Sequence, residues 1–128
     1  MPGSETSYIQ INMNIRKIME LTGAKCVCGD PDSPDNINIR FGFAADLMSD
    51  VLIVQADELL LLTGLCNIQT IRTAEMSDLR CILFVRGKKA TEEMIELAEQ
   101  NSIVLLETPY SMFRAVGELA KGGIEPIF

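Results

Sequence analysis

Threonine, glycine or arginine residues follow three short apolar segments of this sequence. They are Thr63, Gly64, Arg86, Gly87 and Thr108. The segments, residues 59–62, 81–85 and 103–106, are continuous aliphatic runs, which is typical of strands covered on both faces. In an open α/β sheet, ligands bind outside the carboxyl ends of the strands, where helix N-termini offer free N–H groups. Arg86 would add a forked donor for carboxylate or phosphate. These residues are therefore candidates for an anion site, and each also suits an ordinary strand-to-helix turn.

Carboxylates and a serine precede these runs and extend the candidate site. Asp46 and Ser49 are expected to lie near the strand ends. Asp46 and Asp50 are separated by one helical turn, and a carboxylate pair can supply acid and base for phosphate-ester chemistry. The same spacing is common on solvated helix faces. The pair therefore supports an enzyme only as an alternative to a binding site.

Known nucleotide-binding and catalytic motifs are missing from the sequence. A phosphate-binding loop is not formed, because Lys89 stands where serine or threonine is required and Ile82 where the first glycine is required. No G-x-G-x-x-G stretch occurs, and the absence of histidine excludes Ser-His and Cys-His dyads. The aspartate-rich stretch 30–36 lacks the turn glycine and the terminal glutamate of a calcium loop. We therefore expect a protein that is not an enzyme and that needs no cofactor or metal.

The four cysteines predict free thiols. Cys26 and Cys28 form a C-x-C pair in a predicted strand, so both are expected to point to one face of the sheet. A four-thiolate zinc site usually has close C-x2-C pairs, whereas Cys66 and Cys81 are far apart in sequence. Burial as small apolar side chains is the expected state of these residues.

Charge and hydropathy restrict the partners and the location of the chain. It contains 11 Lys and Arg against 18 Asp and Glu, and the net charge of −7 repels nucleic-acid phosphates. No apolar run approaches the roughly 18 to 20 residues of a membrane span, and residues 1–7 lack the features of a secretory leader. We expect a cytoplasmic protein that binds neither nucleic acid nor membrane. Residues 1–12 are expected to form a flexible tail and residues 13–128 a single domain.

Helical patterns alternate with the apolar segments and predict a mostly parallel sheet of about five strands. Thr91 is expected to cap one helix and Thr108 the next, with Pro109 at its first helical position. Shorter strands are expected over residues 25–28 and 37–43. The first predicted helix begins near Ile15, after a cap at Asn12 or Asn14. Four further helices are expected over residues 45–52, 67–76, 91–101 and 109–121.

Three segments, taken in order along the chain, carry a resemblance to a known family. Residues 42–52 combine a glycine, an aspartate-leucine pair and a serine-aspartate pair, and residues 82–87 and 103–111 follow with glutamates between them. This order resembles DRTGG domains, which are related to the N-terminal domain of HPr serine kinase/phosphorylase, over nearly the whole chain. The name-giving letters fall on I-R-F-G, so the acid and the threonine are lost. Arg40 and Gly42 are kept, and they join the candidate ligand-binding residues.

The resemblance implies a three-layer α/β/α domain with a mostly parallel, about five-stranded sheet, similar to the N-terminal domain of the MurF ligase. Such domains lie beside CBS domains in pyrophosphatases, where they look regulatory and help to form dimers, and some stand-alone versions are encoded near iron-hydrogenase subunits. We therefore expect a non-catalytic regulatory or interaction domain. Its expected partners are a second copy and a protein such as a metabolic enzyme or a hydrogenase-type redox complex. A sensor of a small anionic ligand, such as a nucleotide, is the first alternative, and a phosphate-ester enzyme is the second.

Overall fold

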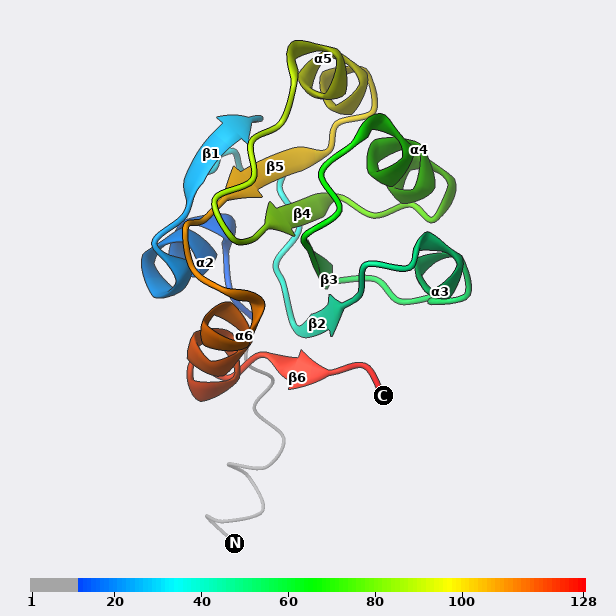
Figure 1. Ribbon diagram of the computed structural model, residues 1–128. Coiled ribbons are helices and arrows are strands. Elements are labelled where there is room, and N and C mark those ends of the chain that lie inside the picture. Colours follow the sequence, from blue (N-terminus) through cyan, green and yellow to red (C-terminus); the bar gives the residue numbers. More distant parts are fainter. Residues whose placement is uncertain (1–11) are drawn as a thin grey trace, which may run out of the picture.

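A six-stranded mixed β-sheet organises the chain in the computed structural model, which describes residues 12–128 (Figure 1). All neighbouring strands are parallel except the pair at one edge, where the first strand of the chain runs antiparallel to its neighbour. The strands lie in the order β1 (Lys25–Cys28), β5 (Val104–Glu107), β4 (Cys81–Phe84), β3 (Leu59–Thr63), β2 (Phe41–Ala44) and β6 (Glu125–Pro126).

Helices cover both faces of this sheet (Figure 1). One face carries α3 (Met48–Leu52), α4 (Ile68–Met76) and α5 (Glu92–Gln100), and the other carries α2 (Ile15–Thr22) and α6 (Met112–Lys121). The α/β class expected from the sequence is confirmed. Within residues 12–128, no helix is long and apolar enough to cross a bilayer. The predicted flexible tail lies outside the described residues, except for Asn12.

Two apolar cores lie on the two faces, and the central strands alternate between them. In β3, Leu59 and Leu61 contact the core under α3, α4 and α5, whereas Leu60 and Leu62 contact the core under α2 and α6. All five residues of β3 are buried. Because helices cover both sides, its first four positions are all leucine, and this explains the continuous aliphatic runs of the sequence.

Two of the predicted N-caps are confirmed and one is wrong. Asn14 accepts the Lys17 N–H at 2.8 Å and begins α2, and Thr91 begins α5. Gly23 closes α2 with a left-handed φ of 63°. The prediction that Thr108 caps α6 is wrong, because Ser111 is the cap. The Thr108 hydroxyl instead donates to the Thr22 carbonyl of α2 and accepts the Tyr110 N–H.

The sheet edge opposite β1 differs most from the sequence-based expectation. The predicted strand 37–43 is shorter, because Ile39 makes an isolated antiparallel bridge with Met13 before β2 begins. The predicted helix 45–52 begins only at Met48, since the Asp46 side chain is bonded to the neighbouring turn. A sixth strand, β6, follows α6, and its two residues are too few to produce a strand pattern in the sequence.

The C-x-C pair does not point to one face of the sheet, which corrects the prediction for Cys26 and Cys28. The two thiols lie on opposite faces, in the two different cores. The register against β5 shifts between them, so that Cys26 pairs with Leu106 and Cys28 with Leu105. Such a bulge inserts one residue and reverses the alternation of side chains beyond it. The pair therefore cannot act as a shared thiol site.

Candidate functional site

The carboxyl ends of β2 and β3 bring Asp46, Thr63 and Gly64 together. Asp46 Oδ1 accepts a hydrogen bond from Thr63 Oγ1 at 3.0 Å and another from the Gly64 N–H at 2.8 Å. Thr63 Oγ1 in turn accepts the Leu65 N–H at 3.0 Å. Thr63 is fully buried, whereas Asp46 is exposed. The turn after β3 is therefore held in one conformation by a carboxylate that stands at the surface.

Arg86 reaches over this turn from the neighbouring strand. A Cβ added to Gly64 would lie 3.0 Å from Arg86 Nη2, so a larger residue would push the guanidinium away. The Arg86 backbone is left-handed, with a φ of 61°, and its N–H donates to the Tyr110 carbonyl at 2.8 Å. Among residues 12–128, no carboxylate lies within ion-pair distance of this exposed guanidinium. Its forked donors are therefore free for an anion.

Thr108 is buried and bonds to the turns that follow β4 and β5. It is 1% exposed, and its hydroxyl donates to the Thr22 carbonyl and accepts the Tyr110 N–H at 3.1 Å. Its carbonyl accepts the Gly87 N–H at 2.9 Å. The residue joins α2 and the turns after β4 and β5, and its part in the site is to position the Arg86-Gly87 turn.

Glu107 is a buried carboxylate at this end that was not among the residues predicted from the sequence. Its side chain is 6% exposed, and Oε2 accepts the Ala90 N–H at 2.7 Å. Lys25 and Lys89 approach Oε1 at 3.8 Å and 4.0 Å. The signal in the sequence is an acid directly after three aliphatic residues of a buried strand, where a charge needs partners. Glu107 fastens the turn after β4 to the end of β5.

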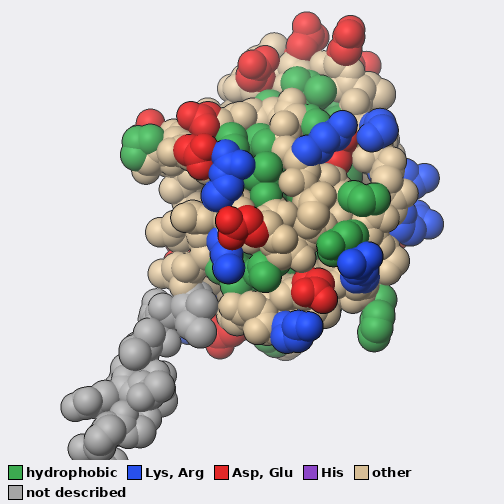
Figure 2. All heavy atoms as spheres, turned by 90° about the vertical axis from the view of Figure 1, so that its left-hand side faces the viewer, with side chains coloured by type: hydrophobic (Ala, Val, Ile, Leu, Met, Phe, Trp, Pro, Cys, Tyr) green, Lys and Arg blue, Asp and Glu red, His purple; other side chains and the backbone are tan. Residues whose placement is uncertain are grey.

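Cationic side chains surround these anchors. Figure 2 shows the side of the molecule that carries α2 and β1, where Lys and Arg are interspersed with acids, whereas acids gather at the top, over α5. Arg114 lies 3.7 Å from the centre of the Tyr110 ring, whose carbonyl accepts the Arg86 N–H. The exposed cations at this end are Lys25, Arg86, Lys88, Lys89 and Arg114.

Cys66 shows how close the three turns lie to one another. Burial raises the pKa of its thiol, the Glu107 carboxylate raises it further, and Lys88 lowers it. These charges come from β5 and from the turn after β4, while Cys66 belongs to the turn after β3. The thiol stays neutral near pH 7, and it is not an activated nucleophile.

Three other candidate residues lie away from Arg86 or carry a different role. Arg40 precedes β2 at the opposite end of the strand, where its Nε donates to Glu125 Oε2 at 3.0 Å. Gly42 lies in mid-strand, and a Cβ there would stand 3.1 Å from a methyl group of Ile124, so its role is packing. Ser49 is exposed in the first turn of α3. The structure therefore brings the Asp46, Thr63, Gly64 and Arg86 set together and separates Arg40 and Gly42 from it.

Asp46 and Asp50 do not lie one turn apart on a helix, because α3 begins only at Met48. Asp46 is engaged in the bonds to the turn after β3, and Asp50 is an exposed residue of α3. In the part of the chain from residue 12 onward, no group of three His, Cys, Asp or Glu side chains converges as a metal site. The helical spacing on which the phosphate-ester alternative was based is therefore not formed.

A solved structure with a similar fold contains the CBS and DRTGG domains of the regulatory region of Clostridium perfringens pyrophosphatase, in complex with the activator diadenosine tetraphosphate. The TM-score is 0.72, the sequence identity is 15%, and the match covers 88% of this chain and 48% of that chain. This chain therefore spans about half the length of that regulatory region. No protein-family model and no curated protein matches the chain.

This likeness is one of fold, and it agrees with the resemblance to DRTGG domains drawn from the sequence. Fold alone does not carry a ligand or an activity from one protein to another. The similarity to the N-terminal domain of HPr kinase remains a prediction.

Proposed function

We propose that this chain is a non-catalytic regulatory domain of the DRTGG type that responds to a small anionic ligand bound beside Arg86. The observation that carries the proposal is the exposed guanidinium over Gly64, which has no carboxylate partner among the described residues. Buried bonds of Thr63 and Thr108 hold the two turns that present it. A site held in place before the ligand arrives loses little conformational entropy on binding.

A ligand with several negative groups suits this end of the sheet best. Lys88 is exposed in the turn that carries Arg86, and Arg114 is exposed in the first turn of α6. A single carboxylate would use only one of these cations. Phosphate groups accept the forked donors of arginine and the point charge of lysine. The pyrophosphatase region of similar fold carries a dinucleotide activator, so nucleotides are the first class to test here.

A binding role is favoured over catalysis because the polar groups of this end are engaged in the structure. Asp46 holds the turn after β3, Glu107 holds the turn after β4, and the Thr108 hydroxyl is buried and bonded. Nucleophilic catalysis needs a nucleophile beside a base with a free proton-accepting atom. The one hydroxyl beside a carboxylate here is that of Thr63, which donates to Asp46, but it is fully buried and also accepts the Leu65 N–H, so it is not presented to a substrate.

Thermal melting at low salt tests the proposed ligand class. Inorganic phosphate, ATP and diadenosine tetraphosphate are added to the full chain, and at least one nucleotide is expected to raise Tm in proportion to the logarithm of its concentration. Arg86→Ala should remove the rise, while Arg86→Lys should keep part of it because charge remains without the fork.

Arg72→Ala is the matched control, since Arg72 is an exposed arginine of α4 outside the site. It should leave the ligand response unchanged. A full rise of Tm in the Arg86→Ala variant, or no response to any of the three anions, contradicts the proposal.

Association with a second copy of this chain is a second candidate function, and a group of exposed apolar side chains favours it. Phe113 and Val116 of α6 are 89% and 38% exposed. Val116 borders a groove of about 280 Å³ between α6 and the β2–β6 edge, and β6 covers only the first two residues of β2. We call Phe113, Val116 and this groove the β6-edge surface. Because the net charge of −7 repels two copies elsewhere, an apolar surface is where they would meet.

Sedimentation over a range of concentrations tests this second function. The wild-type chain should form dimers, and Phe113→Ser combined with Val116→Ser should make it monomeric. Met76→Ser changes another exposed apolar residue, 68% exposed on α4, and should leave the dimer intact. A wild-type chain that is monomeric at every concentration rules out the β6-edge surface as a self-association site.

A further inference from the structure

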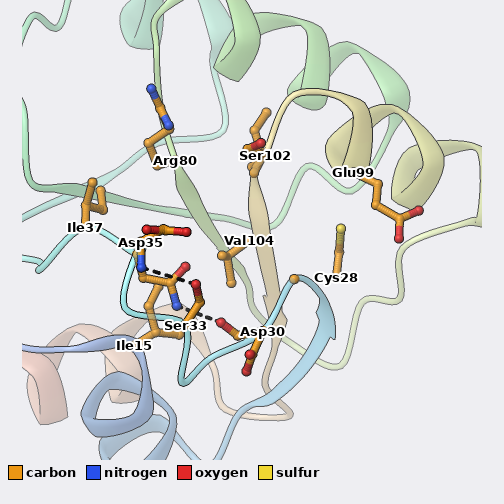
Figure 3. Close-up of a pocket in the computed structure, with 13 residues that line it drawn as sticks. Ile15, Cys28, Asp30, Ser33, Asp35, Ile37, Arg80, Glu99, Ser102 and Val104 are labelled. Atoms are coloured by element: carbon orange, nitrogen blue, oxygen red, sulfur yellow. Dashed lines mark hydrogen bonds between the residues drawn. The ribbon is translucent and has the colours of Figure 1, made fainter.

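A cavity of about 520 Å³ opens at the amino ends of β4 and β5, and the loop of residues 30–36 forms one wall of it (Figure 3). Ile103 and Val104 belong to its lining but are only 2% and 6% exposed, so they present little surface to a ligand. Asp35 and Glu99 lie on opposite sides of Val104 and are exposed (Figure 3). The contacts that hold a site in place lie instead at the carboxyl ends of the strands, beside the proposed anion site.

The backbone of Arg86 is held in a conformation that arginine does not favour. Its φ of 61° is left-handed, and a residue with a Cβ keeps such a conformation only where surrounding contacts hold it. These contacts come from the turn after β5. The Arg86 N–H donates to the Tyr110 carbonyl at 2.8 Å, and the next N–H, that of Gly87, donates to the Thr108 carbonyl at 2.9 Å. The direction in which the guanidinium points therefore depends on where residues 108–110 lie.

Tyr110 is fixed both by its backbone and by its ring. Its N–H donates to Thr108 Oγ1 at 3.1 Å, and the same hydroxyl donates to the Thr22 carbonyl at the end of α2. The half-buried ring lies against Gly23, which closes α2, and the Arg114 guanidinium of α6 lies 3.7 Å from the ring centre. Tyr110 therefore connects the end of α2 and the first turn of α6 to the Arg86 turn.

The contact between α2 and the Tyr110 ring requires glycine at position 23. A Cβ added to Gly23 would lie 3.2 Å from Cε1 of the ring and 3.3 Å from both Cζ and Oη. The φ of Gly23 is 63°, which glycine adopts without strain. A larger residue here would push the ring, and the ring belongs to the residue whose carbonyl holds Arg86.

We propose that Tyr110 is the positioning residue of the anion site, and that it couples the affinity beside Arg86 to the position of the C-terminal end of α2. This inference rests on the proposed function, because it needs an anion that binds Arg86. Coupling between two sites is reciprocal, so a bound anion also restrains the end of α2. Ligand binding thereby reaches a helix that does not hold the ligand, which is what a regulatory domain requires.

Isothermal titration of the full chain with ATP at low salt tests the role of the ring. Tyr110→Phe keeps the ring and should bind ATP as tightly as the wild type. Tyr110→Leu lacks the ring, and its affinity should fall about ten-fold, because one charged hydrogen bond from Arg86 is no longer well placed.

A double-mutant cycle with Gly23→Ala separates positioning from general strain. The added methyl group should lower the ATP affinity of the wild type about three-fold, because it presses on the ring. The same change should not lower the affinity further in Tyr110→Leu, because leucine lacks the atoms that the methyl group meets. The strain of alanine at a φ of 63° is present in both backgrounds and cancels.

Amide hydrogen exchange without ligand gives a second readout. The Arg86 N–H should exchange faster in Tyr110→Leu and in Gly23→Ala than in the wild type, and Tyr110→Phe should leave its rate unchanged. The Val85 N–H, which donates to the Thr63 carbonyl at 3.1 Å, is the internal control for a general loss of stability.

The possible failures of the two proposals are distinct. A wild-type chain that does not bind ATP contradicts the anion site and this inference with it. Binding by the wild type with equal affinity in Tyr110→Leu, or an equal effect of Gly23→Ala in both backgrounds, overturns the positioning role alone. An Arg86 N–H that exchanges at the wild-type rate in both Tyr110→Leu and Gly23→Ala also overturns it. Gly23→Ala keeps the ring, so its exchange rates decide the matter if Tyr110→Leu does not fold.

Discussion

At the carboxyl ends of the strands, the side chains of Thr63, Glu107 and Thr108 are buried, whereas at the amino ends Asp35 and Glu99 are exposed. The buried groups each bond to a neighbouring turn, so this end of the sheet is a fixed platform that presents Arg86. The amino end is a cavity walled by a surface loop, which a surface ion pair fastens to α2. The difference indicates that polar residues at one end support the fold, while those at the other end contribute little to stability.

Substitution of Glu107 is expected to have the largest effect on the free energy of unfolding. Glu107→Ala should lower the free energy of unfolding by about 2 kcal/mol, because the Ala90 N–H loses its acceptor in a partly buried turn. At the amino end, Glu99→Ala should change it by less than about 0.5 kcal/mol, because that side chain is exposed. Urea unfolding of both variants makes the comparison. Equal losses at the two residues would show that the two ends do not differ in this way.

Thr108→Val should cost about 1.5 kcal/mol of the free energy of unfolding, because valine keeps the shape but neither donates to the Thr22 carbonyl nor accepts the Tyr110 N–H. Ser33→Ala removes the corresponding hydroxyl contact of the amino-end loop and should cost less than about 0.5 kcal/mol. Chemical denaturation measures both values. A neutral Thr108→Val would mean that this threonine does not anchor the platform.

Gly64→Ala should alter binding more than stability. The added methyl group would stand 3.0 Å from Arg86 Nη2, and a flexible side chain can move away from it at little cost. The anion-induced rise in Tm should therefore fall while the melting temperature without ligand stays nearly constant. Gly117→Ala is the control, since open space surrounds this helical glycine and the change should stabilise the chain by about 0.5 to 1 kcal/mol. An unchanged ligand response in Gly64→Ala would count against contact between the ligand and Arg86.

The smallest expected effect is the pH dependence of the Arg16–Asp32 ion pair, which stabilises the amino-end loop. The hydrogen bond from Arg16, supported by its charge, lowers the pKa of the Asp32 carboxyl. The pair therefore stabilises the loop fully above the ordinary aspartate pKa, and this contribution is lost as the pH falls through the lowered pKa. An NMR titration of the Asp32 carboxyl carbon should show this midpoint, and Arg16→Gln should move it up toward the ordinary value. Identical midpoints in the two proteins would exclude the ion pair as the fastening of the loop.

Much of the fold follows from the sequence because local patterns encode it. The aliphatic runs around Leu61, Leu83 and Leu105 predict buried parallel strands, and the caps at Asn14 and Thr91 lie where helices begin. These signals depend on neighbours only a few residues apart. The α/β class and the position of the Thr63, Gly64 and Arg86 turns at the carboxyl ends could therefore be predicted.

Contacts between segments that are distant in sequence override some of these local patterns, and only the tertiary structure shows where. Asp46 delays the start of α3 because its carboxylate is bonded to a turn that follows the next strand, and Thr108 does not cap α6 because its hydroxyl is bonded to α2. The bulge that separates Cys26 from Cys28 depends on the register of β1 against β5. The amino-end cavity is formed by elements that are far apart in the sequence, so no local spacing of residues could have revealed it.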